Sequence, residues 1–125
     1  SRNIHRGKMD WAKAEERHDT SSVTGRVFNS IRQLIMIRKR SEIFHSDARL
    51  YPVVTGDDRV LGMVREYNGK KMLGLFNFSY DQVVVEMEHA KRIDMVDPGR
   101  VCGHGEGRTV EFSLEPYGFR WLLEK

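Results

Sequence analysis

Cys102 and His104 are the two residues of this sequence whose types first suggest metal chemistry. Thiolate and imidazole are ligands that zinc prefers, but a Cys-Gly-His spacing is not that of a usual zinc pair, and no second pair lies nearby. Cys102 is also the only cysteine in 125 residues, which excludes an internal disulfide and a multi-cysteine zinc site. We therefore predict no metal site, and nothing in the sequence indicates a cofactor.

Four glycines between Gly99 and Gly107 raise the question of a phosphate-binding loop. Such loops connect a strand to a helix, whose N-terminus faces the phosphate. No helix is expected next to this stretch. We predict a flexible hairpin loop instead.

Tyr117, Phe119 and Trp121 alternate along the chain, so on a strand they would share one face. Their rings would then fill a sandwich core or, if exposed, stack on starch-like sugars. The core interpretation is favoured and the sugar platform stays open. No acidic and basic side chains cluster as an acid and base pair would, so we predict that this chain contains no catalytic residue.

The basic run Arg38-Lys39-Arg40 could contact nucleic acid, but it is more typical of a solvated helix end. Arg38 falls within the apolar arc of its helix. It is either a buried ion-pair anchor, or a last-turn arginine whose stem covers apolar surface while its charge stays in water. The net charge of +3 is spread along the chain, so no nucleic-acid partner is expected.

The composition, with 39% hydrophobic and 31% charged residues, is that of one globular domain. A complete catalytic barrel needs about 250 residues and does not fit. No apolar run approaches the roughly 20 residues that cross a bilayer, and no signal peptide is visible, so no membrane partner is expected. A single free thiol is compatible with a reducing compartment. The chain opens without methionine, and we expect it to be part of a longer protein.

The spacing of apolar residues predicts a helix from Val23 to about Arg40. Its apolar arc is wide, which indicates a helix docked into a large body. Asp10 is expected to cap a short helix that begins at Trp11, and the cluster at residues 19–22 supplies further cap residues.

After Ser41 the pattern becomes that of strands. Two runs, residues 60–67 and 71–78, flank Asn68-Gly69, which predicts a hairpin. Pro52 places a strand at 49–54 on an edge. Further strands are expected at 82–87, 92–96, 109–114 and 118–123, the last two as a closing hairpin. The predicted fold class is α+β: an N-terminal helical segment, residues 1–45, followed by an antiparallel β-sandwich, residues 46–125.

Four segments resemble amylosucrases, which act on sucrose within the α-amylase superfamily of glycoside hydrolases. They are SRNIHRGKMDW at 1–11, GRVFNSIRQLIMIRK at 25–39, LFNFS at 75–79 and LEPYGFRWL at 114–122. The resemblance implies that residues 1–45 are the last loop and eighth helix of a (β/α)8 barrel. It also implies that residues 46–125 are the C-terminal β-sandwich domain.

Such enzymes transfer glucosyl units from sucrose by a retaining mechanism with two carboxylates and a covalent glucosyl-enzyme intermediate. By the resemblance, the nucleophile, the acid/base and the stabilising Asp all lie upstream, so this chain alone is expected to be inactive. The reaction of the complete enzyme could be hydrolysis, α-glucan synthesis or phosphorolysis.

Arg2 is the one substrate-binding candidate, and only in a complete enzyme. It matches an arginine on the loop after the last barrel strand, which faces the acceptor side of the sugar pocket. A guanidinium offers forked donors to sugar hydroxyls or to a carboxylate. His5 and Arg6 lie in the same loop without an assigned role.

The partners expected are the upstream barrel of the same enzyme and, in the complete enzyme, sucrose or α-glucan. A homodimer through the helix is the expected way to cover its apolar face in isolation. The location expected is the bacterial cytoplasm. The alternative is a stand-alone module that binds carbohydrate or another protein.

Overall fold

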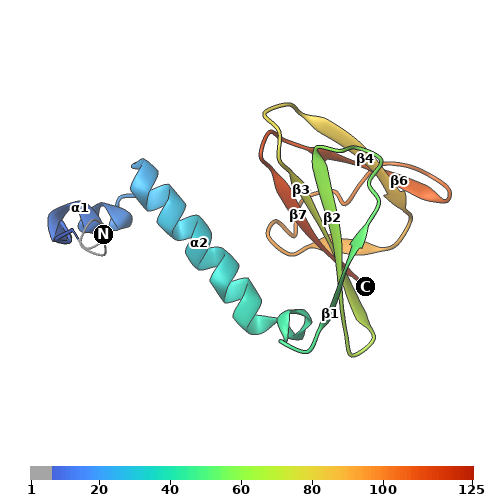
Figure 1. The fold of residues 1–125 in the computed structure, drawn as a ribbon, viewed down its shortest axis with the longest axis horizontal. Helices are drawn as coiled ribbons and strands as arrows, with labels where there is room; N and C mark the ends of the chain where they lie inside the picture. The colour runs from blue at the N-terminus through green and yellow to red at the C-terminus, as the bar shows by residue number, and fades with distance from the viewer. Residues whose placement is uncertain (1–6) are drawn as a thin grey trace. The chain divides into compact units, whose positions relative to one another are not determined.

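A computed structural model describes residues 7–125 of the chain. The chain divides into two compact units, the first ending at Met36 and the second running from Ile37 to Lys125. The first is helical and the second is built mainly of antiparallel strands (Figure 1). The α+β fold class predicted from the sequence is confirmed.

Capping side chains set the starts of the α-helices in the described part of the chain. Helix α1, Trp11–Glu15, begins where the carboxylate of Asp10 accepts a hydrogen bond of 3.0 Å from the backbone N–H of Lys13. A 3-10 turn, η1, covers Glu16–His18, and helix α2 covers Val23–Arg40. The hydroxyl of Ser22 accepts a hydrogen bond of 2.9 Å from the N–H of Gly25 and caps α2. The predicted helix and caps are confirmed.

Gly25 lies where the start of α2 meets the preceding turn. A Cβ at this position would be 1.8 Å from the carbonyl oxygen of Asp19, so no other residue fits without moving the backbone. Hydrogen bonds from the side chain and backbone of Ser21 hold the Asp19 carboxylate in this turn and lower its pKa.

Within residues 7–125, seven strands form two antiparallel sheets. A five-stranded sheet has the order β1-β2-β3-β7-β5, and a two-stranded sheet pairs β4 with β6 (Figure 1). The bounds are β1 Arg49–Val53, β2 Val60–Tyr67, β3 Lys70–Asn77, β4 Val83–Glu88, β5 Arg92–Asp94, β6 Thr109–Leu114 and β7 Phe119–Glu124. A 3-10 turn, η2, at Glu42–Phe44 precedes β1.

The core lies between the two sheets, because every second residue of their strands points inward. The buried apolar cluster is drawn from both sheets: Val60, Leu73, Leu75 and Leu122 from one, and Val83, Val85, Val110, Phe112 and Leu114 from the other. The predicted antiparallel sandwich is confirmed.

The β2–β3 connection is the hairpin that the sequence predicts. Asn68 and Gly69 have φ values of 49° and 76°, so both central residues of the turn are left-handed, as a type I′ turn requires. Strand β1 contains Pro52 and lies at the edge of the five-stranded sheet, which is also confirmed.

The predicted closing hairpin is wrong. Strand β6 pairs with β4, whereas β7 pairs with β3 and β5, so residues 115–118 pass from one sheet to the other. The glycine-rich stretch 99–107 lies in the loop that connects the two sheets, and within it His104 forms an isolated antiparallel bridge with Glu111, a local hairpin-like pairing. At residues 115–118 the short connection favoured a hairpin, but the chain passes between the sheets because each sheet must keep its apolar face inward.

The aromatic alternation in β7 also has a different outcome. Leu122, not Trp121, enters the core, and it is fully buried. Phe119 and Trp121 therefore face outward from the sandwich, and Tyr117 is exposed in the turn before the strand. Both faces of β7 carry large apolar residues, so the residue pattern alone does not identify the inner face.

Two ion pairs lie on the inner face of the five-stranded sheet. Arg120 is 3.4 Å from the carboxylate of Asp94 and donates a hydrogen bond of 2.9 Å to the carbonyl oxygen of Ser113 in the opposite sheet. Arg92 lies 3.4 Å from Glu124. Because its charge is paired and hydrogen-bonded, Asp94 tolerates an exposure of only 1%.

Leu122→Ala should lower the free energy of unfolding by about 3 kcal/mol, because it empties a closed space between the sheets. Leu123→Ala, at the next position on the opposite face, should cost clearly less. Urea unfolding followed by circular dichroism checks both. Equal losses would contradict the assignment of the inner face.

Candidate functional site

The sequence-predicted sugar contact, Arg2, lies outside the described residues, as do His5 and Arg6. Cys102 is half-buried and packs against the core, whereas His104 is exposed and pairs through its backbone with Glu111. Within residues 7–125, no group of three or more His, Cys, Asp and Glu side chains is placed to hold a metal ion. Arg38 is exposed in the last turn of α2, together with Lys39 and Arg40.

One end of the sandwich carries a dense polar network around Asn77, the last residue of β3. Its side-chain N–H groups donate to the carbonyl oxygens of Asp81 at 2.7 Å and Glu115 at 3.0 Å. Its side-chain oxygen accepts from the backbone N–H and the hydroxyl of Ser79 at 2.9 and 2.7 Å. All hydrogen-bonding positions of this buried amide are therefore used.

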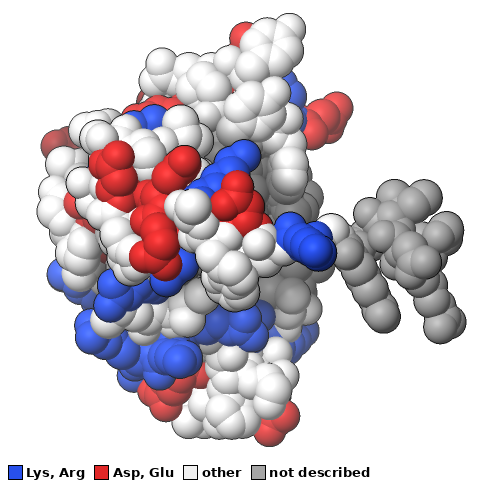
Figure 2. Space-filling view, turned by 90° about the vertical axis from the view of Figure 1, so that its left-hand side faces the viewer, with Lys and Arg blue, Asp and Glu red and all other residues white. Residues whose placement is uncertain are grey.

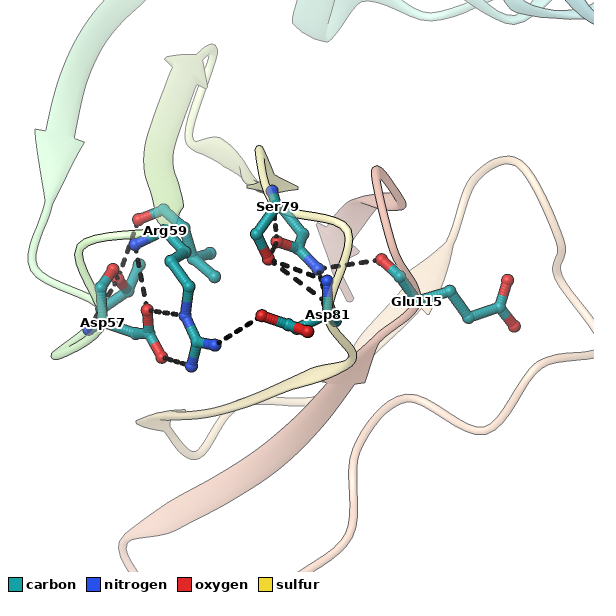
Figure 3. A network of polar contacts seen from close by, with 8 residues as sticks. Asp57, Arg59, Ser79, Asp81 and Glu115 are labelled. Atoms are coloured by element: carbon teal, nitrogen blue, oxygen red, sulfur yellow. Dashed lines mark hydrogen bonds and ion pairs between the residues drawn. The ribbon is translucent and has the colours of Figure 1, made fainter.

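Arg59 extends the network from the turn before β2. Its Nε and Nη2 donate to the Asp57 carboxylate at 3.0 and 2.7 Å, and its Nη1 lies 3.6 Å from the carboxylate of Asp81 (Figure 3). The side-chain and then the backbone hydrogen bonds from Arg59 lower the pKa of Asp57 to about 2, and Asp57 in turn raises the pKa of Arg59. We call this network the polar corner; its members are Asp57, Arg59, Asn77, Ser79, Asp81 and Glu115.

The polar corner joins two of the segments on which the sequence resemblance rests. The backbone N–H of Asn77 donates to the carbonyl of Gly118, and the N–H of Tyr117 donates to the carbonyl of Ser79, both at 2.9 Å. LFNFS and LEPYGFRWL therefore lie side by side. Sequence reasoning named the segments but assigned no role to Asn77. The available signal is an asparagine directly after the apolar run at residues 72–76 of β3.

A second cluster holds η2 on the outer face of the five-stranded sheet, the face turned away from the two-stranded sheet. Arg65 donates from Nε to the carbonyl of Ile43 at 3.0 Å and from Nη2 to that of His45 at 3.1 Å. Glu42 pairs with Lys70 at 2.7 Å, and the Lys70 hydrogen bond lowers the pKa of Glu42.

Aromatic rings continue this cluster across the sheet. The ring of Phe44 lies 4.9 Å from that of Trp121, and Phe119 lies 5.8 Å from Trp121 and 6.3 Å from Phe76, measured between ring centres. Ile43 is fully buried beneath the turn. The segment that directly follows α2 is thus fixed to the sheet by both polar and apolar contacts.

Within the first unit, α2 presents an apolar face that its own unit leaves uncovered. Val27 and Ile31 are 53% and 52% exposed, and Val23 and Ile35 extend the stripe. Together with Met9 and Ala14 this face borders an open groove of about 560 Å³. An exposed apolar stripe of this length is typical of a helix surface that packs against another protein surface.

The face of the molecule in Figure 2 carries both basic and acidic side chains, so this face is not a surface of one charge. None of the helices among residues 7–125 has the length and apolarity to cross a lipid bilayer.

No protein-family description matches the sequence. The fold, however, is similar to parts of three solved structures. They are an alpha-amylase from H.orenii (TM-score 0.65, 13% identity), an AmyP variant in complex with maltotriose (0.64, 16%) and the alpha-glucosyl transfer enzyme XgtA (0.64, 21%). The matches cover 78%, 74% and 88% of this chain.

This chain spans only about a fifth of the length of each of those proteins, between 19% and 20%. Residues 37–125 make up less than three quarters of the chain, so the match with XgtA also takes in part of the first unit. The fold, an antiparallel sandwich preceded by a helix, is similar to a part of each of these three chains.

Arg59→Gln should raise the pKa of Asp57 from about 2 towards its ordinary value of 3.8, because the main charge-assisted hydrogen bonds are lost. The lowered pKa means that this carboxylate stabilises the fold fully above about pH 4, and that the stabilisation is lost as the pH falls towards 2. Carbon-13 NMR titration of the carboxyl group measures the shift. Arg108→Gln should leave it unchanged; a normal Asp57 pKa in the native chain would refute the network.

Proposed function

We propose that this chain is the C-terminal part of an α-amylase-type enzyme that transfers glucosyl units, of the amylosucrase kind that uses sucrose. The sequence resemblance supports the sucrose-acting assignment. The fold similarity to an alpha-amylase and to an alpha-glucosyl transfer enzyme supports the wider class. The observation that carries the proposal is the pairing of an uncovered amphipathic helix with a sandwich of this type in one chain.

In this proposal the chain has a structural role. The apolar stripe of α2 packs into the catalytic barrel as its eighth helix. The turn η2 links the end of that helix to the sandwich, because Arg65 donates hydrogen bonds to the carbonyl groups of Ile43 and His45 directly after the helix ends. The sandwich thereby limits the movement of the last barrel helix.

The chemistry lies elsewhere in the proposed enzyme. A nucleophilic Asp attacks the anomeric carbon of the glucosyl unit while an acidic Glu protonates the leaving oxygen, and the covalent intermediate then reacts with an acceptor. The proposal places both carboxylates upstream of Ser1. Arg2 would contact the acceptor side of the same pocket.

The 125-residue chain should release no fructose from sucrose and no glucose from maltoheptaose. Joined to its natural upstream polypeptide it should act on sucrose, and the double variant Val27→Asp/Ile31→Asp should lose that activity because two charges would enter the helix interface. Val84→Asp is the matched control, since Val84 is 56% exposed on a strand of the sandwich.

Sucrose turnover by the 125-residue chain alone would refute the proposal. So would full activity of the double variant in the joined protein.

The same apolar stripe should make the isolated chain a homodimer. Sedimentation equilibrium should show a dimer for the native chain and a monomer for Val27→Asp/Ile31→Asp, because the substitution charges the contact surface. A native monomer at high protein concentration would contradict this expectation.

A further inference from the structure

The tip of the β2–β3 hairpin carries an Asn-Gly pair, Asn68 and Gly69, and both residues are exposed. The backbone nitrogen that follows an asparagine can attack its side-chain amide, and glycine permits this most readily because it has no Cβ to block the approach. A Cβ placed on Gly69 would meet no other atom within 4 Å. The space that the attack and the entry of water require is therefore open.

The tip extends beyond the strands that flank it. Strand β1 pairs with β2 as far as Glu66, and β7 pairs with β3 from Met72 onwards. Among the strands of the described residues, Tyr67 and Lys70 therefore pair only with each other. The attack requires the backbone of Asn68 to rotate out of its left-handed conformation, in which φ is 49°. Because no neighbouring strand supports the last pair, a local opening of the tip is enough for this rotation.

Asn29 and Asn77, the other asparagines within residues 7–125, lie where the same reaction is opposed. The amide of Asn29 donates to the carbonyl of Gly25 at 2.8 Å, and the surrounding helix keeps the next backbone nitrogen hydrogen-bonded. Asn77 is buried with its amide fully hydrogen-bonded. The amide of Asn68 is held less tightly, because its Nδ2 lies 3.5 Å from Oε2 of Glu42.

The reaction replaces the amide by a carboxylate without oxidation or reduction. The backbone nitrogen of Gly69 loses its proton to solvent and bonds to Cγ of Asn68. The bond between Cγ and Nδ2 breaks, and the leaving nitrogen takes up a proton and departs as ammonia. Water then opens the five-membered imide ring at either carbonyl. One opening gives aspartate, and the other gives isoaspartate, in which the main chain runs through the side-chain carbon.

Either product changes the group of charges that holds η2. Glu42 of η2 pairs with Lys70 at 2.7 Å and accepts a hydrogen bond from Asn68, and these contacts, Lys70 first, lower its pKa. A carboxylate at position 68 cannot donate this hydrogen bond and repels Glu42. Isoaspartate also lengthens a turn that is limited to two residues, so it disrupts the pairing of Tyr67 with Lys70.

We propose that Asn68 is a site of spontaneous deamidation, and that the carboxylate formed there weakens the attachment of η2 to the β2–β3 hairpin. Because η2 directly follows α2, the modification loosens the segment that joins this helix to the sandwich. The proposal is independent of the reaction that a complete enzyme carries out.

Ageing of the 125-residue chain at mildly alkaline pH tests the site. Trypsin releases residues 66–70 as one peptide, and its mass spectrum should show conversion of Asn68 to aspartate and isoaspartate. The conversion should be at least about tenfold faster than that of Asn29 or Asn77, because only the hairpin tip opens easily. Asn68→Gly keeps a residue that tolerates the left-handed backbone but cannot react, so ageing should leave its peptide unchanged.

Asn68→Asp tests the effect on η2, because aspartate also tolerates this backbone. The variant should raise the pKa of Glu42 above its value in the native chain. Hydrogen exchange of the His45 N–H, which bonds to the carbonyl of Glu42 at 2.9 Å, should become about fivefold faster. Asn29→Asp, which adds the same charge on α2, is the matched control and should change neither quantity.

The two parts of the proposal can fail separately. An amide at Asn68 that survives for as long as Asn29, while the urea-unfolded chain reacts at position 68, would refute the site because the folded turn would then protect it. An unchanged Glu42 pKa and unchanged exchange at His45 in Asn68→Asp would refute the effect on η2. The aged native chain provides the same exchange measurement if that variant does not fold.

Discussion

The amide side chain of Asn77 is the contact on which one whole end of the sandwich depends. It is almost fully buried, and it donates two hydrogen bonds to carbonyl oxygens that lie 34 residues apart in the sequence, those of Asp81 and Glu115. It also accepts two from Ser79. No carboxylate or hydroxyl side chain can donate two hydrogen bonds and accept two in this geometry. Loss of the amide would leave several buried polar groups without partners, and such groups are expensive.

This contact determines where the exposed rings and the charged groups of the polar corner lie. The loop after β3 and the link between β6 and β7 carry the exposed rings of Phe78, Tyr80 and Tyr117, and both are fixed by Asn77. Arg59 then ties the turn before β2 to the same place through Asp57 and Asp81. Three loops far apart in sequence thus form one surface of defined shape. On the outer face of the larger sheet, hydrogen bonds from Arg65 to backbone carbonyl groups fix the segment after α2 in a similar way.

Local signals in the sequence predicted the local structure well. Asp10, Ser22 and Asn68-Gly69 act through neighbours a few residues away, so the caps and the hairpin turn could be recognised directly. The two apolar faces of β7 and the passage of residues 115–118 between sheets could not, because they depend on which strands meet in space. The polar corner was only partly predictable. Asp57 and Arg59 are two residues apart, so their ion pair could be inferred from the sequence, but the fold determines that this pair joins one network with Asn77 and Glu115. Arg2, which the resemblance supplied, lies outside the described residues.

The edges of the five-stranded sheet have a consequence for how copies of this domain can meet. One edge, β1, contains Pro52, which has no N–H to offer an incoming strand, and the other edge, β5, is only three residues long. Neither edge is a good template for continuous strand addition. Growth of this sheet into fibrils through its margins is therefore disfavoured, even while the domain carries several apolar residues on its surface.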